Sequence, residues 1–388
     1  MNVRRLLLLP LLMAGASLVV GQLYVTLPLV ADLAQHWQVT AGQASWAGSA
    51  FGFAYAAGFL LLGRLSDRYG RRRVLLVSLV AMALASVGVA VSTSFAMLLG
   101  ARALQGLVAA AFPPAALALV ADVLPPARRP LGISLLSFAF LAAAPLAQFL
   151  AAQPAGWGLP VIMATVAAAG VLLSAGLAIV LPPVTPISVS AVLPVQNAGS
   201  GPERQSELAG VWLAALSVLF AFVTFHAGAQ AMKLAAVDLQ ILRLAGLPSL
   251  LLSLAAARLV RRIGTVATAR AGFAVAAAGL LAGVPGYFGG LVVTSVLLSA
   301  GTALALPGLI GTLASCAAPA SRARAMSIYS FTLFIGASLA PLAAQALAPL
   351  GWLALMLTPA AALLCAVTIV GGLPRLLSIG RQSRPAIS

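Results

Sequence analysis

Twelve long apolar runs constrain this chain more than any other feature. A transmembrane helix needs about 20 consecutive apolar residues, and charged residues make up only 7% of the 388 residues. A soluble fold of this composition could not cover its own surface, so lipid must be the solvent for most of the chain. Runs without two-residue alternation predict helices rather than a barrel. We therefore expect an all-α membrane protein with twelve transmembrane helices over 6–30, 43–63, 74–91, 95–121, 131–152, 159–181, 208–231, 237–259, 267–285, 288–314, 325–347 and 351–372.

The first run permits a second interpretation. Arg4-Arg5, a leucine-rich stretch and Ala14-Gly15-Ala16 together resemble a cleavable signal peptide. The apolar run nevertheless continues to Val30, beyond the apolar region of such a peptide. We expect a retained first helix.

Basic residues are concentrated between alternate runs. The chain carries 22 Lys and Arg against 6 Asp and Glu. With the N-terminus inside, the predicted inner segments hold nineteen of them, namely Arg4, Arg5, Arg64, Arg68, Arg71, Arg72, Arg73, Arg128, Arg129, Arg204, Arg258, Arg261, Arg262, Arg270, Arg322, Arg324, Arg375, Arg381 and Arg384. The exceptions are Arg102, Lys233 and Arg243. This asymmetry predicts cytoplasmic termini in a bacterial inner membrane, with anionic lipid rather than nucleic acid as the partner of the positive charge.

A proline- and glycine-rich stretch and an internal repeat divide the chain in two. Residues 182–207 predict a cytoplasmic linker between six-helix halves at 1–181 and 208–388. The segment 63–70 recurs, more weakly, as 257–264, a shift of 194 residues. Two pseudo-symmetric halves with a parallel repeat are typical of transporters whose binding site lies between the halves near mid-membrane.

The loop after the second run carries a specific motif. Residues 63–74 read Gly-Arg-Leu-Ser-Asp-Arg-Tyr-Gly-Arg-Arg-Arg-Val. This stretch resembles the signature G-x-L-[AS]-D-R-x-G-R-[KR] of the major facilitator superfamily at every position. The resemblance implies a gate that closes the cytoplasmic side, in which Asp67 caps a helix of the other half, span 11. The gating residues that it implies are Gly63, Asp67, Arg68, Gly70, Arg71 and, at the inner end of span 4, Asp122.

Ionisable residues within spans are functional candidates, because their burial in lipid is costly. Residues 99–110 resemble the family's span-4 motif, which implies that Arg102 faces the cavity and assists proton exchange; alternatively, Arg102 reaches the outer interface. His226 in span 7 is the readiest proton carrier of the chain, or else a neutral hydrogen-bonding group. Gln230 shares its helix face.

The family lines its cavity with spans 1, 4, 7 and 10. The resemblance therefore implies these polar cavity residues: Gln22, Tyr24, Arg102, Gln105, His226 and Gln230, with Gln148 on span 5. Candidate apolar cavity residues are Phe112, Phe140 and Phe222. Prolines within the runs predict bends in spans 4 and 10, at Pro113-Pro114 and Pro307-Gly308.

Two departures from the exporters of the family affect the expected chemistry. No Asp or Glu lies in the middle of a span, so a carboxylate proton relay is not expected, and coupling would use His226, Arg102 or an acid at a helix end. The glycines of the family's span-5 motif are lost around Pro145.

The sequence holds no nucleotide-binding, zinc-ligand or nucleophile–base pattern, so we expect no cofactor, no metal and no enzymatic activity. It predicts a monomeric secondary transporter that works by alternating access, most specifically proton-coupled efflux of a small apolar or amphiphilic compound. An uptake carrier or facilitator for a small organic anion is the alternative, because the one deep charge is positive. A non-transporting membrane receptor is less expected, since no long soluble segment is present.

Overall fold

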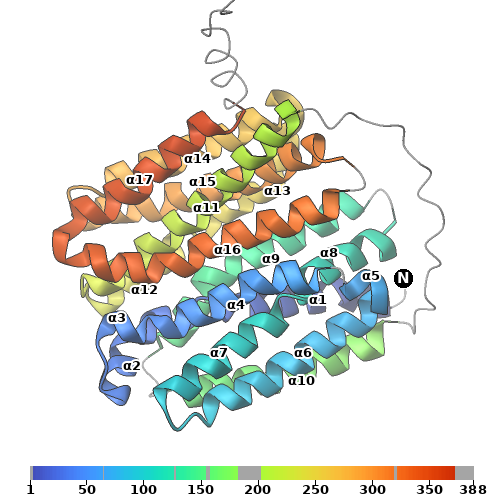
Figure 1. Ribbon diagram of the computed structural model, residues 1–388, viewed down its shortest axis with the longest axis horizontal. Coiled ribbons are helices and arrows are strands. Elements are labelled where there is room, and N and C mark those ends of the chain that lie inside the picture. The colour runs from blue at the N-terminus through green and yellow to red at the C-terminus, as the bar shows by residue number, and fades with distance from the viewer. Residues whose placement is uncertain are drawn as a thin grey trace, which may run out of the picture.

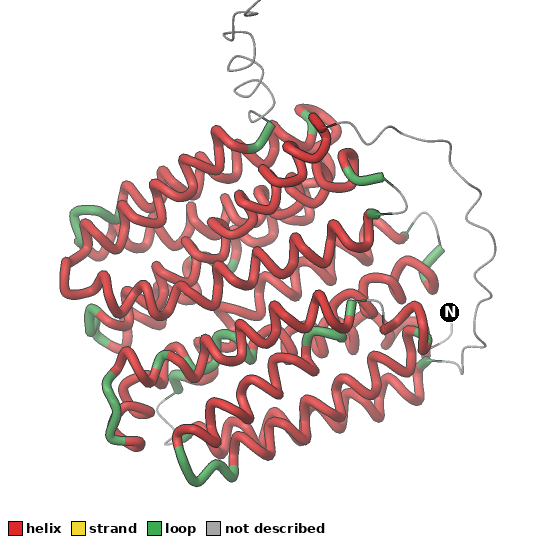
Figure 2. Tube along the Cα trace, in the orientation of Figure 1, coloured by secondary structure: helices red, strands yellow, loops and turns green. Residues whose placement is uncertain are grey.

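The computed structural model describes residues 3–63, 65–125, 128–153, 158–181, 202–318 and 321–371, and these form helices without strands (Figure 2). The first half contains α1 (Val3–Gly21), η1 (Leu27–Leu29), α2 (Val30–Trp37), α3 (Ala41–Ala44), α4 (Trp46–Leu62), α5 (Leu65–Tyr69), α6 (Arg71–Ala90), α7 (Phe95–Ala109), α8 (Phe112–Val123), α9 (Arg129–Ala151) and α10 (Leu159–Val180). The second half contains α11 (Pro202–Ala231), α12 (Ala236–Ala245), η2 (Pro248–Leu251), α13 (Leu252–Ile263), α14 (Thr265–Ala282), α15 (Phe288–Cys316), α16 (Arg322–Leu347), η3 (Ala348–Leu350) and α17 (Gly351–Ile369).

The twelve predicted spans correspond to these helices. Within the described residues, 10 segments are long and apolar enough to cross a membrane. One of them, Arg322–Ile369, contains both α16 and α17, and Leu7–Gly21 is a further, shorter apolar helix. The segments are also apolar where they face outward, with residues such as Leu84 and Leu172 fully on the surface of the bundle. The chain is an all-α, multi-pass membrane protein.

Three of the spans are broken, and two of the breaks differ from the prediction. Helix α1 ends at Gly21 rather than continuing to residue 30, and η1 then begins at Leu27, with Pro28 as its second residue. Span 8 is divided into α12 and α13 by η2, which begins at Pro248. The predicted bend of span 4 is present, because α7 ends at Ala109 and α8 begins at Phe112 with prolines in its first turn. By contrast, α15 continues through Pro307.

The two halves lie side by side (Figure 1). In the first half α6 packs on α10, α4 on α7 and α1 on α9; in the second, α14 packs on α15 and α17, and α11 on α16. Between the halves, α4 contacts α16, and α9 contacts α12 and α13. Helix α11 begins at Pro202 and so extends into the range predicted for the linker; residues 182–201 lie outside the described residues.

Glycines allow several of these helix pairs to approach at backbone distance. A Cβ atom on Gly272 of α14 would lie 2.5 Å from the backbone nitrogen of Ala305 in α15. A Cβ on Gly301 would overlap the carbonyl of Gly272, and one on Gly308 would lie 2.5 Å from the nitrogen of Ala269. The α14–α15 pair is therefore packed backbone to backbone, as small residues permit in membranes.

The repeated loop has the same backbone conformation in both halves. Gly70, between α5 and α6, has φ +85°, and Gly264, between α13 and α14, has φ +88°. Only glycine adopts this region without strain. Both copies therefore need glycine to reverse the chain into the next helix.

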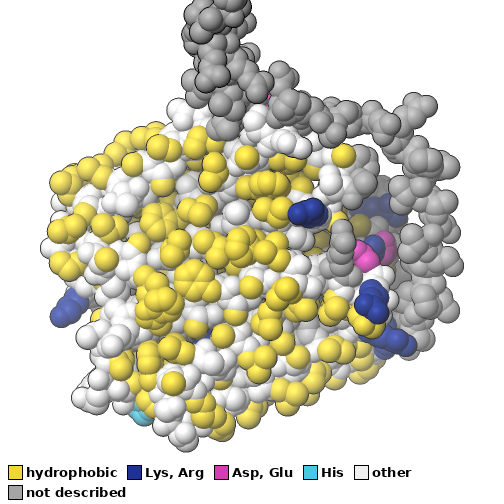
Figure 3. Space-filling view, in the orientation of Figure 1, with side chains coloured by type: hydrophobic (Ala, Val, Ile, Leu, Met, Phe, Trp, Pro, Cys, Tyr) yellow, Lys and Arg dark blue, Asp and Glu magenta, His cyan; other side chains and the backbone are white. Residues whose placement is uncertain are grey.

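Most basic side chains lie at one end of the helices, which we call the arginine-rich end. It holds α5, the starts of α6, α9, α14 and α16 and the end of α13, on the right in Figure 1, and Figure 3 shows most of the visible Lys and Arg side chains toward that side. Some of these arginines also close helix ends. Arg72 donates to the carbonyl oxygens of Ala178 (3.0 Å) and Leu181 (3.2 Å) at the end of α10, and Arg270 to that of Val370 (2.8 Å) after α17.

Candidate functional site

A cavity of about 400 Å³ lies between the two halves. Helices α4, α8 and α9 line it from the first half, and α11, α13, α15 and α16 from the second. It extends from Val20 and Phe222, in the middle of the bundle, to the exposed Asp67 at the arginine-rich end. This volume lies within the range of roughly 300–1,000 Å³ that is typical of small-molecule sites.

At the opposite end the halves are in contact. Ser49 of α4 donates from its Oγ to the carbonyl oxygen of Ser338 in α16 at 2.7 Å. Gln240 of α12 donates from Nε2 to the carbonyl oxygen of Ala152, which follows α9, at 3.3 Å. The cavity is thus closed at this end and extends toward the arginine-rich end.

The cavity wall is mainly apolar and partly aromatic. The rings of Tyr55 and Phe59 in α4 lie 5.0 Å apart, and both contact Phe334 of α16, at 4.6 Å and 5.3 Å between ring centroids. The Phe59 and Phe334 rings are parallel. Among the described residues in the wall, only Asp67 carries a charge. An aromatic cluster shared by both halves favours apolar ligands with flat rings.

Three of the predicted cavity residues line this cavity: Tyr24, Phe140 and Phe222. Arg102 does not. It is completely buried within the first half, where Nε donates to the carbonyl oxygen of Ala47 at 3.0 Å and Nη2 to that of Gln22 at 2.6 Å. Its Nη1 donates to Oε1 of Gln105, whose Nε2 in turn donates to Ser86 at 2.7 Å. The guanidinium therefore joins α4, α6, α7 and the end of α1, and neither faces the cavity nor reaches the outer interface in this conformation.

Gln148 and Phe112 also lie away from the cavity. Gln148 is buried in α9, and its Nε2 has no hydrogen-bond partner among the described residues. Phe112, at the start of α8, is fully buried and packs on Gly15 of α1, where an added Cβ would lie 2.7 Å from the ring. Its ring holds two helices of the same half together.

His226 lies just beyond the closed end of the cavity. Phe222, His226 and Gln230 follow one another at four-residue spacing and share one face of α11. Phe222 lines the cavity, and its ring lies 4.8 Å from that of His226. Gln230 accepts a hydrogen bond from the buried Arg243 at 2.8 Å and donates to the carbonyl oxygen of Pro28, in the other half, at 3.5 Å. His226 therefore sits between the cavity and a contact that joins the halves.

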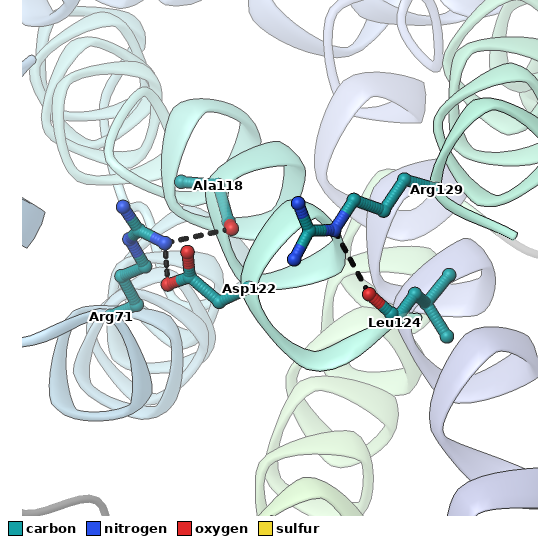
Figure 4. A network of polar contacts seen from close by, with 5 residues as sticks. All are labelled: Arg71, Ala118, Asp122, Leu124 and Arg129. Carbon is teal, nitrogen blue, oxygen red and sulfur yellow. Dashed lines mark hydrogen bonds and ion pairs between the residues drawn. The ribbon is translucent and has the colours of Figure 1, made fainter. Parts of the chain in front are cut away.

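The predicted gating residues are only partly in contact with one another. Arg71, at the start of α6, forms an ion pair with Asp122 at the end of α8 and donates to the carbonyl oxygen of Ala118 at 2.9 Å (Figure 4). Asp67 forms no hydrogen bond or ion pair within the described part of the chain, so the predicted cap of span 11 by Asp67 is not formed in this conformation. The physical reason is that the cavity extends between the halves at this end and Asp67 lines it.

The other gating residues lie at the same end. A Cβ on Gly63 would come within 2.8 Å of Ser327 Oγ in α16, so the end of α4 closely approaches the second half. Arg68 is exposed, and its guanidinium lies 5.3 Å from the ring of Tyr69.

Three side chains in the cavity wall were not predicted from the sequence: Tyr55 of α4, Ser253 of α13 and Tyr329 of α16. All are buried, and the hydroxyl oxygen of each has no hydrogen-bond partner among the described residues. Leaving a buried hydroxyl unpaired costs roughly 1–3 kcal/mol. A tyrosine in the middle of an apolar run was the available signal, because its hydroxyl must find a partner where lipid offers none.

Comparison with known families decides the identity of the fold. Residues 12–240 match the Major Facilitator Superfamily. The chain belongs to this family. The superfamily consists of transporters rather than enzymes, and its members bind small-molecule substrates.

Several curated relatives of this superfamily member are export proteins by name. The chain is 36% identical to the multidrug export protein EmrB of Escherichia coli K12 over 101 residues, which are 26% of this chain and 20% of that protein. It is 33% identical to the tetracenomycin C resistance and export protein of Streptomyces glaucescens over 115 residues, 29% of this chain and 21% of that protein. A triacylglyceride transporter of Mycobacteroides abscessus is 45% identical over 69 residues, 18% and 13% of the two chains. The chain thus spans about a fifth or less of the length of these relatives.

A solved structure supports the superfamily fold over the whole bundle. The crystal structure of the human organic anion transporter MFSD10 superimposes with a TM-score of 0.69 at 20% sequence identity, covering 95% of this chain and 100% of that chain. At this identity the similarity concerns the fold alone.

Proposed function

We propose that this protein exports a small apolar or amphiphilic compound from a bacterial cell by alternating access, with proton coupling. The observation that carries the proposal is the cavity: it lies between the halves, is mainly apolar, and is closed at one end. The arginine-rich end corresponds to the cytoplasmic side by the distribution of positive charge. The cavity is then open to the cytoplasm and the inner leaflet, where an exporter loads its substrate.

The export direction has further support in the relatives. Two of those matched are named export proteins, although each is matched over only part of its length. The organic-anion alternative depended on Arg102 as a charge in the cavity. Since Arg102 is buried among neutral acceptors of its own half, and no basic residue lies in the described wall, uptake of an anion has less support than export of an apolar compound.

For proton coupling we propose His226 as the carrier. In this conformation it is buried one helical turn beyond the cavity, on the face of α11 that meets the first half through Gln230. When the halves separate at that end, water reaches the imidazole, which titrates readily near neutral pH once hydrated. One side chain would then take up a proton from outside and lose it after the return movement. The whole unit acts as a monomer, because one chain supplies both walls of the cavity.

The export test is a susceptibility panel in a bacterial host that lacks its own exporters. At matched expression, wild type should raise tolerance to a subset of apolar dyes and antibiotics, and Asp67→Asn should abolish it by disabling the gate. If wild type protects against none of them but accelerates uptake of organic acids, the export proposal is wrong.

The coupling test uses everted vesicles with an acidic interior. The compound found in the panel should dissipate the pH gradient with wild type but not with His226→Asn, while the variant still binds the compound. His36→Asn is the matched control, because His36 is exposed on α2 and is the only other histidine of the chain. Unchanged proton movement in His226→Asn would exclude His226 as the carrier.

A further inference from the structure

The unpaired hydroxyls of Tyr55, Ser253 and Tyr329 are the feature of this cavity that the proposed function leaves unexplained. Tyr55 is 0% exposed, Tyr329 3% and Ser253 5%. Each side chain lies in the cavity wall, and each hydroxyl oxygen is buried without a partner. Buried polar groups in native proteins are nearly always hydrogen-bonded, so three exceptions around one cavity need an explanation.

The three hydroxyls come from both sides of the cavity. Tyr55 belongs to α4 of the first half, and its ring is held against Phe51, Phe59 and Phe334 at centroid distances of 5.5, 5.0 and 4.6 Å. Ser253 and Tyr329 belong to α13 and α16 of the second half. The cavity therefore has one of these hydroxyl-bearing side chains on the first-half side and two on the second-half side, while the aromatic cluster fixes the position of the Tyr55 ring.

The charge of the wall restricts what that ligand can be. The described wall contains no Lys, Arg or His, and its single acid, Asp67, lies at the exposed rim rather than beside the aromatic cluster. A charged group placed deep in this cavity would be desolvated without a counter-ion, which is costly. A neutral hydroxyl or carbonyl group loses less on burial and is what an unpaired hydroxyl can bind.

We propose that Tyr55, Ser253 and Tyr329 select uncharged substrates that combine a flat apolar body with a hydroxyl or carbonyl group, which these hydroxyls bind. The inference rests on the proposed function for the role of the cavity and adds the substrate class and the residues that determine it. It makes the three hydroxyls specificity determinants rather than packing groups.

The test is a binding assay that does not depend on transport. Four probes share one ring system and one position of substitution: phenanthrenemethanol, methylphenanthrene, phenanthrenecarboxylate and phenanthrenemethylammonium. Binding of tritiated phenanthrenemethanol to the purified full chain is measured by scintillation proximity in one detergent, and the other three are measured by displacement. Wild type should bind phenanthrenemethanol most tightly and the two ions most weakly.

The variants Tyr55→Phe, Tyr329→Phe and Ser253→Ala each remove a hydroxyl while keeping the rest of the side chain. Loss of one neutral hydrogen bond should weaken phenanthrenemethanol binding by about five- to tenfold in at least one variant, with methylphenanthrene changed less than about twofold. Tyr287→Phe is the matched control, because Tyr287 is 62% exposed and lies outside the cavity wall. Thermal unfolding of each variant checks that the fold is retained.

Two results would overturn the inference. If the hydroxyl-deleting variants weaken phenanthrenemethanol and methylphenanthrene equally, the side chains only shape the cavity. If the carboxylate or the ammonium binds best, or if phenanthrenemethanol does not bind, the substrate class is wrong. Failure of export in cells with intact discrimination between the probes would instead reject the proposed function and leave this inference standing.

Discussion

Replacing Arg102 by lysine should destabilise the protein more than replacing it by methionine, although lysine keeps the charge. The guanidinium is completely buried, and its three nitrogens each donate to a different acceptor, on Ala47, Gln22 and Gln105. A planar fork can satisfy three acceptors arranged around it, whereas a single ammonium nitrogen cannot approach all three.

The magnitude follows from the hydrogen bonds and the buried charge. A hydrogen bond to a charged group contributes about 1.5–3 kcal/mol, so a lysine that keeps one bond and loses two should lose roughly 3–6 kcal/mol. Methionine loses all three bonds, about 5–9 kcal/mol, but also removes a charge whose burial costs several kcal/mol. The net loss for Arg102→Met is then about 1–4 kcal/mol.

The assay is thermal unfolding of the purified variants in one detergent. The expected order of apparent midpoints is wild type, then Arg102→Met, then Arg102→Lys. Arg261 is the control position, because it is exposed at the end of α13 and both substitutions there should leave the midpoint unchanged. The reasoning is wrong if the Arg102→Lys protein is at least as stable as the Arg102→Met protein. The positive charge, and not the three separate acceptors, would then be what position 102 requires.

Three further substitutions test the helix packing and the ion pair. Gly336→Ala should lower the free energy of unfolding by about 1–3 kcal/mol, because the new Cβ would overlap the carbonyl of Leu216 in α11; Gly100→Ala, at an exposed helical position with nothing within 4 Å, should raise it by up to about 1 kcal/mol. Both are measured by thermal unfolding, and equal effects would contradict the packing argument. Asp122→Asn should change the free energy of unfolding by about 1 kcal/mol or less, because its ion pair with Arg71 is one-third exposed. The same variant should nevertheless slow transport in vesicles. A larger loss of stability with normal transport would show that the ion pair is structural only.

The sequence predicts the helices well, because lipid requires a backbone that satisfies its own hydrogen bonds. It predicts where a helix is interrupted only if nearby residues in the sequence are enough to cause the interruption. Pro113 and Pro114 lie in the first turn of α8, directly after the break in span 4, whereas Pro307 is accommodated within α15. The break at η2 begins at Pro248, a local signal that the prediction of an unbroken span 8 did not use.

The candidate site was harder to predict, because a span shows which residues are polar but not which way they face. Arg102 is the clearest example: its partners Gln22 and Ala47 are distant in the sequence and become neighbours only when three helices pack. Tyr55 and Tyr329 were overlooked for the opposite reason, since tyrosine contributes to an apolar run while its hydroxyl needs a partner. That Phe222, His226 and Gln230 share one face of α11 was predictable, because they repeat at helical spacing, but only Phe222 of the three lines the cavity.

The backbone contact between α14 and α15 has a mechanical consequence. Close backbone packing at Gly272, Gly301 and Gly308 leaves no room for a side chain between the two helices, so α15 is supported along its length by α14. In a cycle of the proposed kind, backbone rotation is easier where η1 and η2 interrupt their spans and where α7 meets α8, because these positions lie at helix ends. Under the proposed function, the few residues at these helix ends would then act as the hinges of the movement, although none of them needs to touch the substrate.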